Sequence, residues 1–173
     1  MNTRPDDGAR AEAALRAMAT LAAAQAREDQ PAALFNALDA ALAALIGHTL
    51  FTILLYDGVT NESARIYSNM PAKYPTGAKK PLSGGRWVET VLTRGDAFIG
   101  RTRDDLRAVF GDHELIASLG CESVLNVPVR WRGRTLASLN LLHAEGWYRA
   151  EHVPLTQSLA QFALPALLDS AID

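Results

Sequence analysis

Two strand-like runs in the second half of the chain, residues 123–129 and 136–143, constrain the fold more than any other feature. Arg132-Gly133 lies between them, which predicts a hairpin. A two-residue turn would place six side chains on one face of the sheet: Leu125, Val127, Val129, Leu136, Ser138 and Asn140. The other face would then carry Val124, Asn126, Ala137, Leu139 and Leu141. Both faces are largely apolar, so other elements must cover both of them.

The rest of the chain alternates between helical and strand-like patterns. Helical spacing of apolar residues predicts helices at 9–27, 31–46, 86–94 and 150–171, with two shorter helices between Thr102 and Gly120. Thr102 can cap the first of these shorter helices. Strands are expected at 49–56, 64–68 and 97–99, and a turn at Asp57-Gly58 joins the first two. Residues 69–85 contain prolines and glycines without periodicity and predict a long exposed loop. Pro165 should kink the final helix.

Length and charge limit the classes of protein to which the chain can belong. With 173 residues, the chain can bury one core without disulfides, and its single cysteine agrees with this. The net charge of −2 gives no bulk attraction to nucleic acid or to an anionic membrane. The first residues carry no apolar run, so we expect a cytoplasmic, bacterial-type protein with a disordered tail at 1–8 and a single domain at 9–173.

Three short motifs resemble those of the GAF domain family. Residues 119–129 read Leu-Gly, two variable residues, Ser, and then a strand that ends apolar-Pro-apolar. Residues 132–134 and 137–141 are similar to the family's turn and last strand, although Ala137 stands where the family usually has glycine. Trp147-Tyr148 and Glu151 resemble the residues that lead into its final helix. The resemblance covers about residues 31–168.

The resemblance implies an α/β (α+β) fold that is related to PAS domains. Its central antiparallel sheet would carry the terminal helices on one face and a small-molecule pocket, roofed by loops and short helices, on the other. Members bind small molecules, and many form homodimers through their terminal helices. We therefore expect residues 9–27 to be a dimerisation element.

Several side chains are candidates for binding a ligand in such a pocket. Arg86 follows Ser83-Gly84-Gly85, a turn that could hold an anion, although a helix cap explains Ser83 equally well. Aromatic stacking, an apolar floor and polar contacts are expected from the remaining candidates, which are Phe51, Ile53, Tyr74, Trp87, Phe110, His113, Ser123 and Asn140. Packing in the core is the alternative for each aromatic residue. If a bulge shifts the register of the hairpin, Asn126 takes the place of Asn140.

Catalytic, metal and cofactor motifs are weak in this sequence. Cys121 precedes the acidic Glu122, which does not favour a thiolate, and we expect a buried, inert cysteine. A GAF relative, the free methionine-(R)-sulfoxide reductase, uses several cysteines and carboxylates, which this chain does not match. The four histidines do not have the spacing of metal ligands. We expect no metal, and the sequence leaves the identity of a cofactor open.

These observations lead to three hypotheses about function. The first is a non-enzymatic sensor in signal transduction, a homodimer that binds a small organic molecule and acts through a protein partner. The second is a divergent sulfoxide reductase that uses Cys121 with an external thiol. The third is a protein-interaction subunit with a closed pocket, whose contacts come from the terminal helices or from the basic hairpin tip at Trp131.

Overall fold

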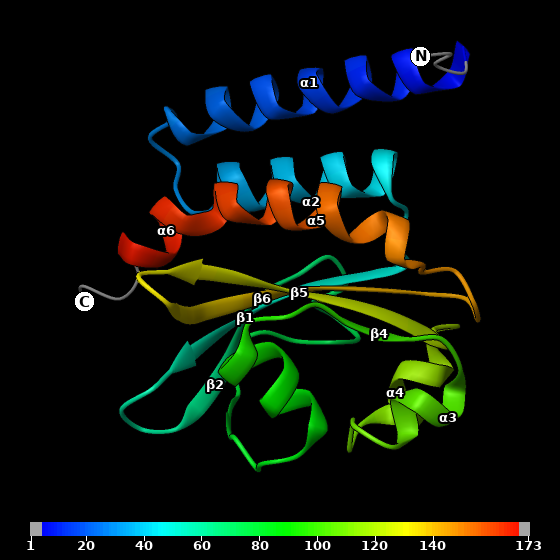
Figure 1. The fold of residues 1–173 in the computed structure, drawn as a ribbon. Helices are drawn as coiled ribbons and strands as arrows, with labels where there is room; N and C mark the ends of the chain where they lie inside the picture. The colour runs from blue at the N-terminus through cyan, green and yellow to red at the C-terminus, as the bar shows by residue number, and fades with distance from the viewer. Residues whose placement is uncertain (1–4, 170–173) are drawn as a thin grey trace.

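A six-stranded antiparallel sheet forms the centre of the computed structural model, which describes residues 5–169. The strands are β1 Leu50–Asp57, β2 Glu62–Ser68, β3 Lys79–Pro81, β4 Phe98–Gly100, β5 Ser123–Trp131 and β6 Arg134–His143. Their order across the sheet is β3-β2-β1-β6-β5-β4, so the two hairpins lie next to each other and β1 pairs with β6 (Figure 1). The sequence predicted every strand except β3, which lies within the expected loop.

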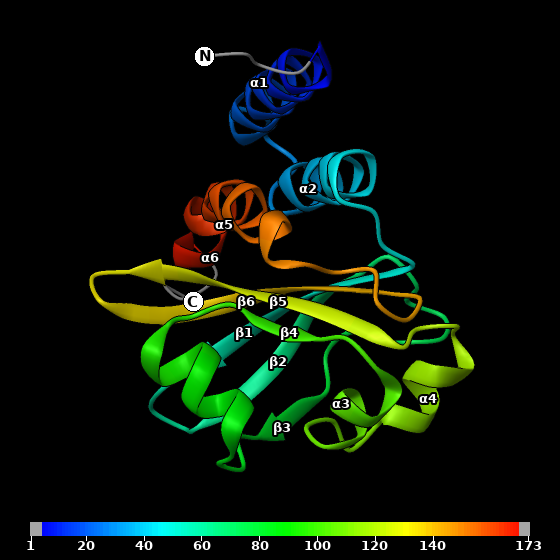
Figure 2. The same ribbon diagram turned by 45° about the vertical axis from the view of Figure 1, so that its right-hand side comes forward.

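Helices from both ends of the chain cover one face of the sheet. Next to the sheet lie α2 Ala32–Leu45 and α5 Val153–Ala160, followed by α6 Leu164–Asp169, and α1 Pro5–Gln25 forms an outer layer over them (Figures 1 and 2). The core on this side is built from strand residues such as Leu125, Val127 and Leu139, which pack against Leu38 and Leu159. This arrangement confirms the predicted antiparallel sheet with the terminal helices on one face.

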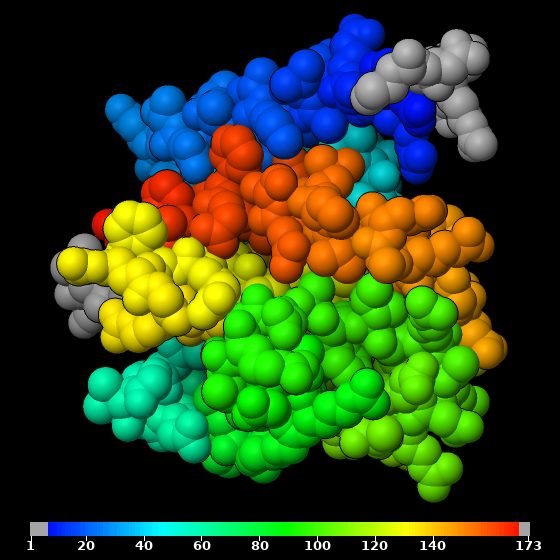
Figure 3. Space-filling model, viewed as in Figure 1, coloured from blue at the N-terminus to red at the C-terminus, as the bar shows by residue number. Residues whose placement is uncertain are grey.

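Short elements cover the opposite face of the sheet. These are the π-helix η1 Val88–Arg94, α3 Arg103–Arg107 and α4 His113–Ser118. Thr102 caps α3 through a reciprocal capping box with Asp105, as the sequence predicted. In the space-filling view, the segments drawn in green form a continuous layer beneath the sheet (Figure 3).

The register of the β5–β6 hairpin differs from the predicted one by one residue. Arg132 and Gly133 form the expected turn, but a bulge between Val129 and Arg130 shifts the pairing, so Val129 lies opposite Ala137. The amide of Gln161 from the C-terminal helical segment brackets the bulge, because it accepts from the Arg130 N–H (2.8 Å) and donates to the Arg130 carbonyl (3.0 Å). The shift places Asn126 opposite Asn140, on the face away from the terminal helices.

The ends of the chain also differ from the predictions in detail. The first helix begins at Pro5, inside the expected tail, because proline is tolerated in the first turn of a helix. Residues 1–4 of that tail lie outside the described residues, as do residues 170 and 171 of the final helix. That helix is divided by η2 Ala150–His152 and η3 Gln161–Ala163, and η3 ends just before Pro165. Across the described part of the chain, no helix is long and apolar enough to span a membrane.

Candidate functional site

A cavity of about 270 Å³ lies between the sheet and the short elements that cover its second face. Its floor is formed by side chains of three strands, β1, β5 and β6: Thr52, Leu54, Val124, Asn126, Asn140 and Leu142. Its roof comes from the connection between β2 and β3, from the segment that precedes η1, and from the connection between α3 and α4. These segments are the loops and short helices that were expected to roof a pocket.

The floor of the cavity carries a pair of buried amides. Asn126 Nδ2 donates to Asn140 Oδ1 (2.6 Å), and Trp87 Nε1 donates to Asn126 Oδ1 (3.0 Å). Ser138 Oγ also donates to Asn140 Oδ1 (2.8 Å), while Asn140 Nδ2 donates to Thr52 Oγ1 (3.3 Å). The asparagine side chains are only 1% and 4% exposed, so these hydrogen bonds replace contacts with water and fix both amides.

Aromatic side chains enclose one side of the cavity. Trp87 lies at the start of η1 and meets the rings of Tyr56 and Phe110 edge to face, at centroid distances of 6.1 and 6.4 Å. Tyr56 also shares a hydrogen bond with Ser138 Oγ (2.6 Å), and its burial raises the pKa of its phenol. Trp87 therefore links the aromatic wall to the amide floor.

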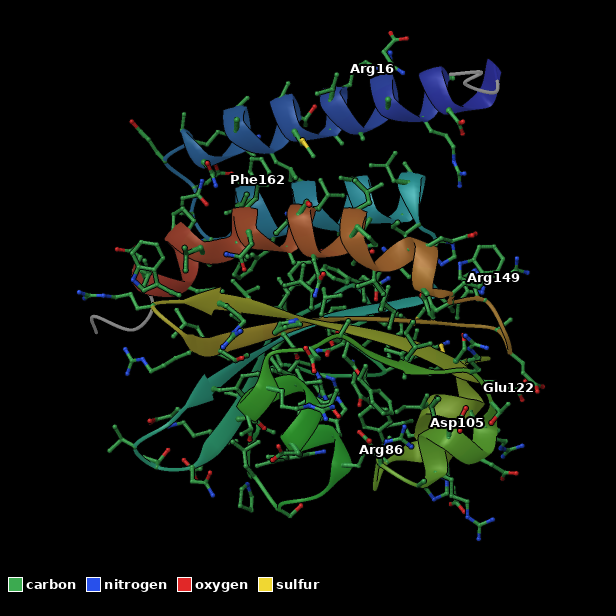
Figure 4. All side chains as sticks on the ribbon, viewed as in Figure 1. Arg16, Arg86, Asp105, Glu122, Arg149 and Phe162 are labelled. Carbon is green, nitrogen blue, oxygen red and sulfur yellow. The ribbon has the colours of Figure 1, made fainter. Side chains whose placement is uncertain are left out.

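Charged side chains also form part of the cavity wall. Arg65, Lys80 and Arg86 line it, and the guanidinium of Arg65 lies 3.6 Å from the centroid of the Tyr74 ring. Tyr74 donates its hydroxyl hydrogen to Asp112, and burial together with that carboxylate raises the pKa of the phenol. In Figure 4, Arg86 and Asp105 both lie in the layer below the sheet. Backbone N–H groups that donate to the carboxylate of Asp105 lower its pKa most, and the positive charge of Arg86 lowers it further.

Five of the predicted ligand-binding residues line the cavity: Tyr74, Arg86, Trp87, Phe110 and Asn140. The structure thus brings together candidates from β6 and from three separate roof segments.

The other four predicted residues lie outside the cavity lining. Phe51 and Ile53 are fully buried in the core beneath the terminal helices, because alternation along β1 directs Thr52 and Leu54 to the cavity instead. Ser123 donates to the Ala144 carbonyl (2.7 Å), which gives it a structural partner at the end of the hairpin. His113 does not line the cavity, whereas its neighbour Asp112 does.

Sequence reasoning missed Thr52, Arg65, Lys80 and Asp112, all of which line the cavity. The alternation in β1 could have indicated Thr52 only if the sequence had also shown which face of that strand the terminal helices cover. Arg65 and Lys80 come from neighbouring strands at one edge of the sheet, and the short β3 gave no strand signal. Asn126 was named only as a replacement for Asn140 in the case of a bulge, whereas the structure has the bulge and places both asparagines on the cavity floor.

Cys121 does not line the cavity, although the second apolar cluster to which it belongs includes the lining residues Val124 and Leu142. It is 1% exposed, and burial raises the pKa of its thiol to about 11, so the reactive thiolate is disfavoured at neutral pH. His48 pairs with Asp39 (3.0 Å), and His143 stacks on Trp147 at a centroid distance of 3.8 Å. Within residues 5–169, no group of three potential ligands is placed to hold a metal ion.

No protein-family model matches the sequence, and no curated protein sequence matches it either. Solved structures do match the fold. The GAF domain of the Acinetobacter phosphoenolpyruvate-protein phosphotransferase is 15% identical, with 94% of this chain and 95% of that chain covered and a TM-score of 0.70. The corresponding GAF domain from Coxiella burnetii is 14% identical, with coverages of 94% and 93% and a TM-score of 0.65.

A third solved structure is an enzyme, the free methionine-R-sulfoxide reductase from Neisseria meningitidis in complex with its substrate. It is 16% identical, with 99% of this chain and 96% of that chain covered and a TM-score of 0.66. At such sequence identities, the similarity between the structures concerns the fold, and the chemistry of each protein depends on the residues of its own site. The antiparallel sheet, the layer of terminal helices and the roofed cavity thus identify this chain as having the fold of a GAF domain.

Proposed function

We propose that this chain is a small-molecule-binding domain of a sensor, and that its ligand binds in the cavity between the sheet and the roof. The observation that carries this proposal is the amide pair of Asn126 and Asn140. Apolar residues would pack at these positions without any need for hydrogen-bond partners, whereas fixed amides on a cavity floor are suited to orienting a polar ligand. The role as a sensor is supported by neighbours that are domains of two-component sensor histidine kinases, one of them a GAF domain.

Thermal unfolding in the presence of metabolite pools tests this proposal. A ligand at a hundred times its dissociation constant should stabilise the folded chain by about 2.7 kcal/mol. For a domain of this length, that corresponds to a rise in Tm of roughly 5–10 °C. The matched control is Ser63→Trp, which places an indole at a half-buried position of the cavity wall. A shift that persists unchanged in Ser63→Trp, or no shift with any pool, would contradict binding in this cavity.

The geometry gives less support to a reductase that uses Cys121. A nucleophilic thiol must reach its substrate, but Cys121 does not line the cavity and is nearly free of solvent contact. The similarity to the reductase from Neisseria meningitidis therefore supports a ligand pocket on this fold, but it does not support catalysis by Cys121.

We further propose that the sensor is a homodimer whose subunits meet through the terminal helices. Among the residues of α1 whose burial is described, 7–25, Leu21 and Ala24 are the buried ones, while Leu15 remains 66% exposed on the outer layer. Leu15→Glu should then convert a particle of twice 18.7 kDa into one of 18.7 kDa in sedimentation velocity. Leu115→Glu is the matched control, because Leu115 is an exposed leucine on α4, far from α1 in the fold (Figure 1). A wild-type monomer, or dissociation by both variants, would contradict the helical interface.

A further inference from the structure

The side chains that line the cavity carry more positive than negative charges. Three cationic side chains line it, Arg65, Lys80 and Arg86, and Asp112 is the one acidic residue among the described lining residues. The whole chain carries a net charge of −2, so this positive lining is a local feature of the cavity. A cleft lined by one sign of charge raises the local concentration of the opposite ion.

Asp112 joins separate segments of the cavity lining, because its carboxylate contacts side chains from two of them. Its carboxylate accepts the hydrogen bond of Tyr74, and the same oxygen lies 3.7 Å from Lys80 Nζ. Tyr74 belongs to the connection between β2 and β3, Lys80 belongs to β3, and Asp112 immediately precedes α4. The carboxylate thereby occupies the position in which a ligand anion would meet a cation and a phenolic donor.

Arg65 has a hydrogen-bond donor that the described part of the chain leaves unsatisfied. Its Nη1 donates to the Pro75 carbonyl (2.7 Å), but its Nε is shielded from solvent and has no acceptor. A buried donor without an acceptor is costly. An anion bound beside Arg65 would supply one.

We propose that the ligand is a compact anion, and that its carboxylate or phosphate group competes with Asp112 for Lys80 and Tyr74. This inference rests on the proposed function of the cavity and specifies the chemical class of the ligand. Arg65 and Arg86 supply further positive charge in the cavity wall, while the amides of Asn126 and Asn140 contact the uncharged part of the molecule. The volume of about 270 Å³ is slightly below the usual range for drug-sized ligands, which favours a molecule of metabolite size.

Substitution of Asp112 separates an anionic ligand from the alternatives. Asp112→Asn retains an oxygen acceptor for Tyr74 but removes the competing charge, so anions should bind more tightly. Glu114→Gln is the matched control, because it removes an equal charge two residues away, at an exposed position outside the lining. Lys80→Gln removes the cation and should weaken binding of the same anions.

The probes are inorganic phosphate, succinate, the neutral succinamide and the cation 1,4-diaminobutane, titrated calorimetrically at low ionic strength. We expect Asp112→Asn to bind phosphate or succinate roughly tenfold more tightly than wild type, and Glu114→Gln to change affinity by less than about twofold. Weaker anion binding in Asp112→Asn, equal effects of both variants, or preference for the diamine would overturn the inference.

Failure of this inference can be distinguished from failure of the proposed function. If neither anion binds to wild type or to Asp112→Asn, the ligand class is wrong, but a metabolite that raises the Tm of wild type and not of Ser63→Trp would still place a ligand in the cavity. If phosphate alone binds and succinate does not, the anionic group is a phosphate. If succinate alone binds, it is a carboxylate.

Discussion

Gly47→Ala is expected to lower the free energy of unfolding by about 3 kcal/mol, a large part of the roughly 5–15 kcal/mol that stabilises a domain. Gly47 ends the second helix at a φ of +89°, where an L-side chain costs about 1–2 kcal/mol. A Cβ there would lie 2.8 Å from Cζ2 of Trp147. The indole would have to move and weaken the hydrogen bond that Trp147 Nε1 donates to the Ile46 carbonyl (3.0 Å), worth about 1 kcal/mol.

Gly77→Ala is the matched control for this effect. Gly77 also has a left-handed φ, +92°, but a Cβ there would meet no atom within 4 Å. It should therefore show only the conformational cost of about 1–2 kcal/mol. The measurement is urea unfolding of both variants beside wild type, followed by tryptophan fluorescence. Equal losses in the two variants would mean that the approach of Trp147 contributes nothing to stability.

The local patterns of the sequence predicted most of the fold because each depends on neighbouring residues. The turn at Arg132-Gly133, the cap at Thr102 and the break near Pro165 all lie where the sequence placed them. The bulge at Arg130 was not predicted, because it is held by Gln161, which lies 31 residues away. A shift of one residue in a strand exchanges its two faces, so this distant contact decides where the hairpin presents its asparagines.

The candidate site was predictable only in part for the same reason. The sequence indicated Trp87, Phe110 and Asn140 because unusual residue types in the expected roof or sheet call for an explanation. It directed Phe51 to the wrong face, since alternation in β1 identifies two faces without saying which one the terminal helices cover. The approach of Asp112 to Lys80 is set by the packing of two irregular roof segments, and neither segment has a periodic pattern.

The two buried amides should depend on each other, so that replacing both costs less stability than the sum of the two single replacements. Asn140→Leu leaves Asn126 Nδ2 and Ser138 Oγ without their common acceptor, so we expect a loss of about 2–3 kcal/mol. Asn126→Leu removes the acceptor of Trp87 Nε1 as well as the partner of Asn140, and we expect a loss of about 2 kcal/mol. In the double variant no asparagine is left without its partner, although Trp87 Nε1 and Ser138 Oγ still lack an acceptor, so the loss should be smaller than the sum of the two single losses.

A double-mutant cycle in urea measures this coupling, which should exceed about 1 kcal/mol in favour of the double variant. The same four proteins are then titrated with a ligand found in the thermal screen. Every variant that lacks an asparagine should bind it at least roughly tenfold more weakly, including the double variant, because each fixed amide contributes hydrogen bonds that leucine cannot replace. Additive stability losses would mean that the amides do not depend on each other. Full binding by a stable double variant would show that the pair serves the fold alone, whereas recovered stability without binding would assign the amides to the ligand.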